Sequence, residues 1–316
     1  MITIQYVFWL VGAMFAAFAL LSALDRTNPK RFGNAAFWGL VALSLIAGHR
    51  LGDLANGGLV LGLAALASLR LIGRGRPATG EAERAAAGER HGNALFLPIL
   101  VVLFTAVAGT LAYLYTPLHE TGLFERNRET FILLCLGVLL ALALIFAWLK
   151  PPALAPIEEG RRLIDAVGWA AVLPLMLAAL GLVLADTGVG RTIGTLILTV
   201  IPDGTILPAV VAFGLGMALF TILTGNAFAA FPVMATAIGV PILIQAYHGD
   251  PAVVGAIGML AGFCGTLMTP MAANFNLVPA ALLELKDQNG VIKAQIGTAI
   301  PLLAVNIALI YLLAFR

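Results

Sequence analysis

Two long stretches of the chain contain no charged residue, residues 204–247 and residues 251–283. At about 1.5 Å of rise per helical residue, each is too long for one straight bilayer crossing, which needs about 20 residues. Small polar residues interrupt the middle of each stretch, at Thr224-Gly225-Asn226 and across residues 262–270. This pattern predicts a helical hairpin over residues 204–247 and a broken helix over residues 251–285.

The rest of the chain carries simpler apolar runs of the length of a transmembrane helix. The expected spans are residues 3–24, 32–48, 54–72, 94–115, 131–149, 163–184 and 291–315. We therefore predict an all-α polytopic membrane protein with about eight transmembrane helices, counting the broken helix, plus the hairpin. We expect the hairpin to be re-entrant, but two full crossings fit the same pattern.

Composition supports the membrane assignment, because 61% of the 316 residues are hydrophobic and only 11% are charged. Soluble domains carry about 25% charged residues. The lipid bilayer is therefore the expected environment. The net charge of +2 gives no reason to expect a nucleic-acid partner.

The spans suggest three parts of unequal length. Residues 1–75 are expected to be a three-span scaffold, and the polar, glycine-rich residues 76–93 a cytoplasmic linker that is helical in part over residues 81–90. Residues 94–316 would then form a transport repeat. Its expected parts are scaffold spans over 94–203 with a short interfacial helix within 186–201, the hairpin 204–247, the broken helix 251–285 and the last span 291–315.

Basic residues give the expected orientation, since loops rich in Lys and Arg stay in the cytoplasm. Thirteen of the 18 Lys and Arg residues fall in or beside the loops near 25–31, 73–93, 150–162 and 284–293. These loops are therefore expected to be cytoplasmic, which places the N-terminus outside. Both ends of the hairpin then lie on the outer face, whether it re-enters or crosses twice.

The hairpin tip is a candidate binding site, because broken backbone at membrane depth survives only inside protein or beside a water-filled cavity. Gly225 allows the turn, Asn226 can cap the second arm, and Thr224 adds a hydroxyl. Carbonyl groups at the end of the first arm suit a cation, and N–H groups at the start of the second suit a carboxylate.

The second break offers similar groups. We expect turns at Gly262 and Gly265, hydroxyls from Thr266 and Thr269, and a new helical half beginning at Pro270. The amides of Asn274 and Asn276 complete this set. For Thr224-Gly225-Asn226 the alternative is a plain polar turn between two full spans, and for the GxxxG at Gly258–Gly262 it is close helix packing.

Charged side chains are nearly absent from this region. No Lys or Arg lies between Arg191 and Lys286, and between Arg191 and Glu284 the acidic residues are Asp203 and Asp250, both at expected membrane edges. A small anionic substrate would therefore be held by helix N-termini, amides and hydroxyls. Coupling to Na⁺ fits this set better than coupling to H⁺, and the expected Na⁺ ligands are Thr224, Asn226 and Thr266.

Other chemistry has little support. The four histidines have no metal-ligand spacing, Cys135 and Cys264 lie in apolar runs, and no nucleophile or paired-carboxylate motif appears. We expect neither an enzyme nor a bound cofactor. No second copy of the two breaks occurs within residues 1–160, so another chain is expected to supply the other half of the site.

Two segments carry a family resemblance, TGNAFAAFPVMATAIGVPI at 224–242 and GMLAGFCGTLMTPMAANFNLVPAALLELKDQNGVIKAQ at 258–295. They resemble the bacterial permease family called domain of unknown function 979. That family is similar to one half of the ion transporter superfamily, whose hairpin tips read Ser-Asn-Thr where this chain has Thr224-Gly225-Asn226. By this resemblance, Thr224, Gly225 and Asn226 are tip residues and residues 265–276 form the loop of the broken helix.

The resemblance also implies a function. It suggests a bacterial inner-membrane subunit of a cation-coupled permease for 5-oxoproline or a similar carboxylate, working by an elevator motion. A second, smaller membrane subunit would carry the complementary hairpin. The alternative is a membrane scaffold or regulatory subunit that does not itself transport.

Overall fold

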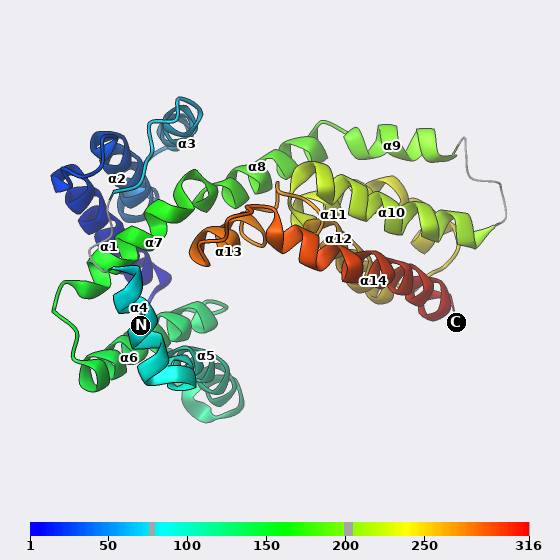
Figure 1. Cartoon of the computed structure of the whole chain (residues 1–316). Coiled ribbons are helices and arrows are strands. Elements are labelled where there is room, and N and C mark those ends of the chain that lie inside the picture. The colour runs from blue at the N-terminus through cyan, green and yellow to red at the C-terminus, as the bar shows by residue number, and fades with distance from the viewer. Residues whose placement is uncertain (76–79, 199–204, 316) are drawn as a thin grey trace. The chain divides into compact units, whose positions relative to one another are not determined.

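The computed structural model describes residues 1–75, 80–198 and 205–315, and these are helical apart from their loops and one isolated bridge between Ile2 and Phe124 (Figure 1). The chain divides into two compact units, Met1–Asp165 and Ala166–Arg316. We describe each unit by itself.

The first unit contains most of the predicted simple spans. Its helices are α1 (Ile4–Leu24), α2 (Arg31–Ala47), α3 (Asp53–Ser68), α4 (Glu81–His91), α5 (Leu97–Tyr115), α6 (Glu129–Leu149) and α7 (Ala155–Val167), with short 3-10 turns η1 (Gly92–Phe96) and η2 (Pro117–Thr121). Helix α1 packs against α2, and α5 packs against α6. The linker is helical through α4, as the sequence predicted.

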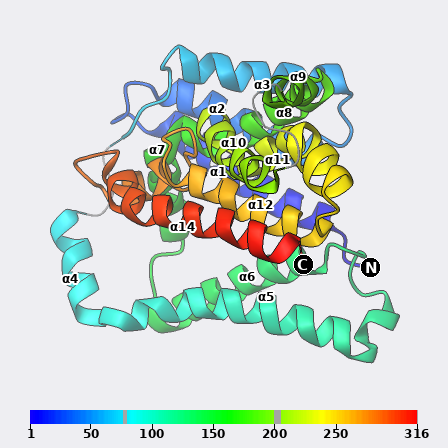
Figure 2. The same cartoon turned by 90° about the vertical axis from the view of Figure 1, so that its right-hand side faces the viewer.

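The second unit contains both breaks. It begins with a 3-10 turn, η3 (Gly168–Ala171), followed by α8 (Leu173–Asp186), α9 (Val189–Leu198), α10 (Ile206–Thr224), α11 (Ala227–Met234), the π-helix η4 (Ala235–Ala246), α12 (Pro251–Thr266), α13 (Leu277–Leu282) and α14 (Gly290–Ala314). Helices α10, α11, α12 and α14 run side by side in both views (Figures 1 and 2).

The core of the second unit lies between α10, the π-helix, α12 and α14. Phe213 and Met217 of α10, Ile238 of the π-helix and Ile310 of α14 are fully buried there. Hydrocarbon outside a membrane protein is as apolar as its core, so close van der Waals packing is the main attraction between helices. Gly258 of α12 allows this close packing because it has no side chain, and a Cβ there would lie 2.5 Å from a ring carbon of Phe213.

The chain is a multi-pass membrane protein. Among the described residues, six helical stretches are long and apolar enough to cross a bilayer, and α2, α3 and α12 are shorter apolar helices. Most expected spans match observed helices to within a few residues. The sequence therefore predicted the fold class correctly.

The sixth expected span, residues 163–184, was wrong as a single helix. Helix α7 ends at Val167, η3 intervenes, and α8 begins at Leu173. Gly168 adopts a φ of +59°, which ends α7, and Pro174 stands in the first turn of α8, where its missing N–H has no cost. The two compact units divide after Asp165, beside this interruption.

The predicted hairpin is present, with one unexpected feature. Its first arm, α10, has 19 residues, and its second arm, Ala227–Ala246, has 20, so each is long enough to cross a bilayer. Arm length is thus compatible with either two crossings or a re-entrant loop. The second arm changes from an α-helix to a π-helix at Ala235. Pro241 lies within the π-helix, and because it has no N–H to donate, it interrupts the regular hydrogen bonding of an α-helix.

Helix α9 matches the expected short helix within residues 186–201, of which residues 199–201 lie outside the described residues. It packs on the second arm of the hairpin through two glycines. A Cβ at Gly190 would collide with Thr236, and one at Gly194 would lie 2.6 Å from the carbonyl oxygen of Ala237. This packing contact was not foreseen.

Candidate functional site

The hairpin tip has the local structure that its three residues predicted. Gly225 ends α10 in the left-handed conformation, with a φ of +71°. The Asn226 side chain then caps α11, its Oδ1 accepting a hydrogen bond from the backbone N–H of Phe228 at 2.9 Å. Thr224 is buried, and its hydroxyl donates to the carbonyl of Phe220 at 2.9 Å. The lone pairs of this hydroxyl remain available to a ligand.

The second break lies later than expected. Helix α12 continues through Gly262 and Gly265 to Thr266, and the non-helical segment runs from residue 267 to residue 276. The expectation that these two glycines turn the chain was therefore wrong. They are packing residues, because a Cβ on Gly265 would collide with the carbonyl of Ala218 and one on Gly262 would lie 2.8 Å from the methyl group of Met217.

Pro270 does not begin the next helical half, as the sequence suggested. It is exposed within the non-helical segment, and the next helix, α13, begins at Leu277. Asn274 is also exposed in this segment. Of the predicted residues with polar side chains at this break, Thr266, Thr269 and Asn276 are buried.

Asn276 holds the second break together. Its side-chain Nδ2 donates to the carbonyl of Thr266 at 2.8 Å and to the carbonyl of Thr269 at 2.7 Å. The Thr266 carbonyl lies at the C-terminal end of α12, where helix carbonyls lack intrahelical partners. Asn276 thus satisfies backbone groups that would otherwise be bare in a membrane.

The hairpin tip and the second break contact each other. The hydroxyl of Thr269 donates to the carbonyl of Ile222, near the end of α10, at 2.9 Å. Gly225 lies against the carbonyl of Met271, since a Cβ at position 225 would be 2.5 Å from that oxygen. Phe228 and Phe263 pack edge to face with their centroids 5.7 Å apart. The two interruptions that the sequence placed 40 residues apart therefore form one structure.

Two buried oxygens near this contact have no hydrogen-bond partner among the described residues. They are Oγ1 of Thr221, one turn before the tip, and Oδ1 of Asn276. Both residues have an exposed fraction of 0%. An unpaired buried polar atom costs about 1–3 kcal/mol, so such atoms call for a compensating ligand or role. Asn276 was among the predicted site residues, and Thr221 was not.

Thr221 could have been found from helical spacing. It precedes Thr224 by three residues, which places the two side chains on neighbouring positions of one helix face. Its Oγ1 is directed towards α12, because a Cβ at Gly262 would lie 3.3 Å from it.

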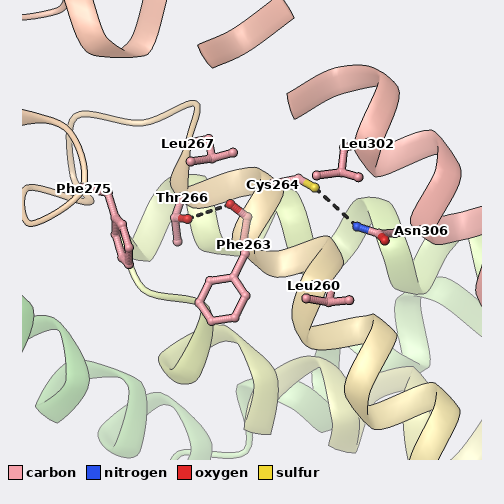
Figure 3. A pocket seen from close by; sticks show the side chains of 8 residues that line it. All are labelled: Leu260, Phe263, Cys264, Thr266, Leu267, Phe275, Leu302 and Asn306. Carbon is pink, nitrogen blue, oxygen red and sulfur yellow. Dashed lines mark hydrogen bonds between the residues drawn. The ribbon is translucent and has the colours of Figure 1, made fainter. Parts of the chain in front are cut away.

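A pocket of about 500 Å³ adjoins the second break, between α12 and α14 (Figure 3). Its lining residues are Leu260, Phe263, Cys264, Thr266, Leu267, Phe275, Leu302 and Asn306. Two hydrogen bonds are drawn there, in which Asn306 donates to Sγ of Cys264 at 3.5 Å and Thr266 donates to the carbonyl of Phe263 at 2.6 Å (Figure 3). This apolar pocket does not suit a carboxylate.

The side chains at the tip and the second break are all neutral. The nearest acidic group along α12 is Asp250 at its other end. Asp250 caps the first turn of α12 by accepting from the N–H of Ala252 at 2.8 Å. No group of three or more His, Cys, Asp and Glu side chains that could hold a metal ion occurs among the described residues. The polar groups that the site offers are hydroxyls, amides and helix ends.

Comparison with known proteins gives a family but no characterised relative. No curated protein and no solved structure matches the chain. One family model, described as a protein of unknown function (DUF979), matches residues 5–315. That match includes both helix breaks, and the chain therefore belongs to the DUF979 family.

Proposed function

We propose that the chain is a subunit of a secondary active transporter for a small carboxylate such as 5-oxoproline, coupled to a cation. The contact between two helix interruptions within an apolar, multi-pass chain carries this proposal. Broken helices that meet inside a membrane protein are the usual setting of substrate and ion sites.

The cation belongs, on this proposal, beside the two unpaired oxygens of Thr221 and Asn276. Oxygen atoms are the preferred ligands of hard cations. The C-terminal ends of α10 and α12 add the negative ends of their helix dipoles near this place. Thr224 and Thr266 each donate their hydroxyl proton to a backbone carbonyl, which leaves oxygen lone pairs for Na⁺. Asn226 uses its Oδ1 for the helix cap, and its backbone carbonyl accepts from the N–H groups of Ala229 and Ala230, so on this proposal its part is to hold the tip in shape.

The substrate carboxylate belongs at the N-terminal end of α11. The positive end of a helix dipole attracts anions without a charged side chain. The substrate identity rests on the family resemblance. The same resemblance supports a bacterial inner-membrane location and a second, smaller membrane subunit that supplies the complementary hairpin.

The decisive experiment uses Thr221→Val in cells that express the chain together with the smaller membrane subunit that this proposal requires. The Thr221 hydroxyl makes no hydrogen bond within the part of the chain that the structure describes, so its removal should leave folding intact. If the hydroxyl binds the coupling ion, its removal should raise the Na⁺ concentration for half-maximal uptake of labelled 5-oxoproline at least about tenfold. The reason is that a hydrogen bond or contact to a charged group is worth about 1.5–3 kcal/mol.

Ser22→Ala is the matched control. Its Oγ is likewise buried and unpaired, but it lies on α1 in the first unit. We expect the Na⁺ dependence of uptake to be unchanged in this variant. Uptake that is insensitive to Thr221→Val and to Asn226→Ala, with normal membrane insertion, would instead support a scaffold or regulatory subunit.

A further inference from the structure

A buried cluster of charged groups lies in the first unit. Arg161 of α7 donates through Nη1 to Oδ2 of Asp25, just after α1, at 2.8 Å. The same Nη1 lies 3.6 Å from Oδ2 of Asp165, one turn further along α7. The exposed fractions of the three side chains are 16% for Arg161, 9% for Asp25 and 4% for Asp165.

Neutral donors hold Asp165 from a second helix. Its Oδ1 accepts from Nε1 of Trp38 at 2.7 Å and from Nδ2 of Asn34 at 2.9 Å, and both of these α2 residues are fully buried. Asn34 also exchanges two hydrogen bonds with the backbone of Gly73. Helix α2 and Arg161 therefore contact this carboxylate directly, while Asp25 joins the cluster through Arg161 and Gly73 joins it through Asn34.

The cluster has more negative than positive charge. Two carboxylates face a single guanidinium, so among the described contacts of this cluster there is one more negative than positive charge. Of the other charged groups on these segments, Lys30 donates to the carbonyl of Arg70 at 2.6 Å and Arg162 pairs with Glu159 at 2.6 Å. A buried charge without a partner is costly enough that such groups commonly bind a proton instead.

We propose that Asp25, Arg161 and Asp165 form a proton-binding site in which Asp165 takes up the proton and Asp25 remains ionised on Arg161. The geometry separates the two acids. Asp25 makes the short contact with the guanidinium and accepts two hydrogen bonds from Thr27, whereas Oδ2 of Asp165 has only the longer ion-pair contact.

The electrostatic environment acts in the same direction. Burial raises the pKa of Asp165, and this outweighs the hydrogen bond from Trp38, the charge of Arg161 and the hydrogen bond from Asn34. Burial also acts to raise the pKa of Asp25, but the hydrogen bonds from Thr27 and Arg161 and the charge of Arg161 bring it below its usual value. Both groups lie outside the helices that are long enough to span a membrane.

Trp38 provides a direct test, because its indole N–H is bonded to the proposed proton acceptor. The experiment uses the purified full chain in detergent with Trp9, Trp148 and Trp169 changed to Phe. We expect the fluorescence of Trp38 to follow a single-proton transition at a pH above the ordinary aspartate range. Asp165→Asn keeps the shape and the acceptor oxygen and should abolish that transition.

Two charge variants should move the transition in opposite directions. In Asp25→Asn, Asp165 is the one carboxylate of the cluster that Arg161 can pair with, so the pH midpoint of the fluorescence transition should fall. Arg161→Gln removes the opposite charge, so the midpoint should rise by about 1–3 pH units. Far-ultraviolet circular dichroism of each variant confirms folding, and the Asp25→Asn shift alone decides the matter if Arg161→Gln does not fold.

The infrared carbonyl stretch of a protonated carboxyl gives a second measurement. This band should disappear as the pH rises, with the same pH midpoint as the fluorescence change, and it should be missing in Asp165→Asn. A flat fluorescence profile, or a transition that survives Asp165→Asn, overturns the proposal. These measurements need no substrate, so their outcome is independent of whether the chain transports a carboxylate.

Discussion

Gly225 shows how a single residue determines the geometry of the candidate site. Its left-handed backbone conformation turns the chain, and its missing side chain lets the tip lie against the carbonyl of Met271. Either requirement alone favours glycine. Together they make position 225 the tightest constraint at the contact between the two breaks.

Gly225→Ala should therefore destabilise the protein more than a left-handed backbone alone explains. A left-handed conformation costs a residue with a Cβ about 1–2 kcal/mol, and the collision with Met271 adds to this. The control is Gly188→Ala, because Gly188 has a similar φ of +75° but open space around it. We expect a lower unfolding midpoint in detergent for Gly225→Ala than for Gly188→Ala, and equal midpoints would contradict the proposed close contact.

The residues of the tip were predictable from sequence because their roles are local. A glycine followed by asparagine between two apolar runs specifies a helix end and a helix start without reference to the rest of the fold. The unpaired state of Thr221 and the close contact of Gly265 with Ala218 could not be predicted, for the opposite reason. Their importance comes from a neighbouring helix that is distant in sequence, and no local pattern reports what that helix presents.

At the scale of elements, the crossing of α10 and α12 depends on small residues. Gly262 and Gly265 of α12 lie against α10, where Gly265 meets the backbone of Ala218. This proximity keeps the end of α12 beside the hairpin tip. The break therefore lies after the glycines, in the segment where Asn276 rather than a helical ladder satisfies the backbone carbonyls.

Gly265→Ala should force α10 and α12 apart. Inserting one methyl group into a packed core costs about 1–3 kcal/mol, and here the opposing atoms are backbone, which cannot move aside. Gly297→Ala in α14 is the matched control, since nothing lies within 4 Å of its Cβ position. We expect the first variant to lower the unfolding midpoint and the second to leave it unchanged or raise it slightly, because alanine favours helix.

Helices were the most predictable elements, since their apolar length is itself the signal. The exceptions have physical causes that composition hides. The expected span over residues 163–184 is divided by the left-handed Gly168, and the second hairpin arm changes to a π-helix around Pro241. Glycine and proline are common in membrane helices, so their presence alone predicts neither an interruption nor its form.

At the scale of the whole molecule, the sequence pattern and the packing divide the chain at different places. The expected parts were separated at the polar linker, residues 76–93, whereas the two compact units meet after Asp165. A polar loop is easy to recognise in a sequence, but the association of spans depends on side-chain contacts that hydropathy does not contain. The assignment of residues 94–316 as a transport repeat stays a prediction.

The pH dependence of stability is a property of the whole chain, and Asp165 should contribute to it. Its raised pKa means that the folded state binds a proton that the unfolded state has already released. Between the ordinary and the raised pKa, stability should therefore fall as pH rises. The difference in unfolding midpoint between the natural chain and Asp165→Asn should change with pH across this window, and a constant difference would contradict the raised pKa.

The neutrality of the two helix breaks has an electrical consequence. If the side chains that surround the cargo carry no charge, the charge moved in each transport cycle is that of the cargo alone. One Na⁺ with one monocarboxylate moves no net charge, so uptake into vesicles should be independent of an imposed membrane potential. A second Na⁺ would move one elementary charge, worth about 2.3 kcal/mol per 100 mV, and an interior-negative potential would then accelerate uptake. The current carried per substrate molecule thus counts the ions that two uncharged loops can hold.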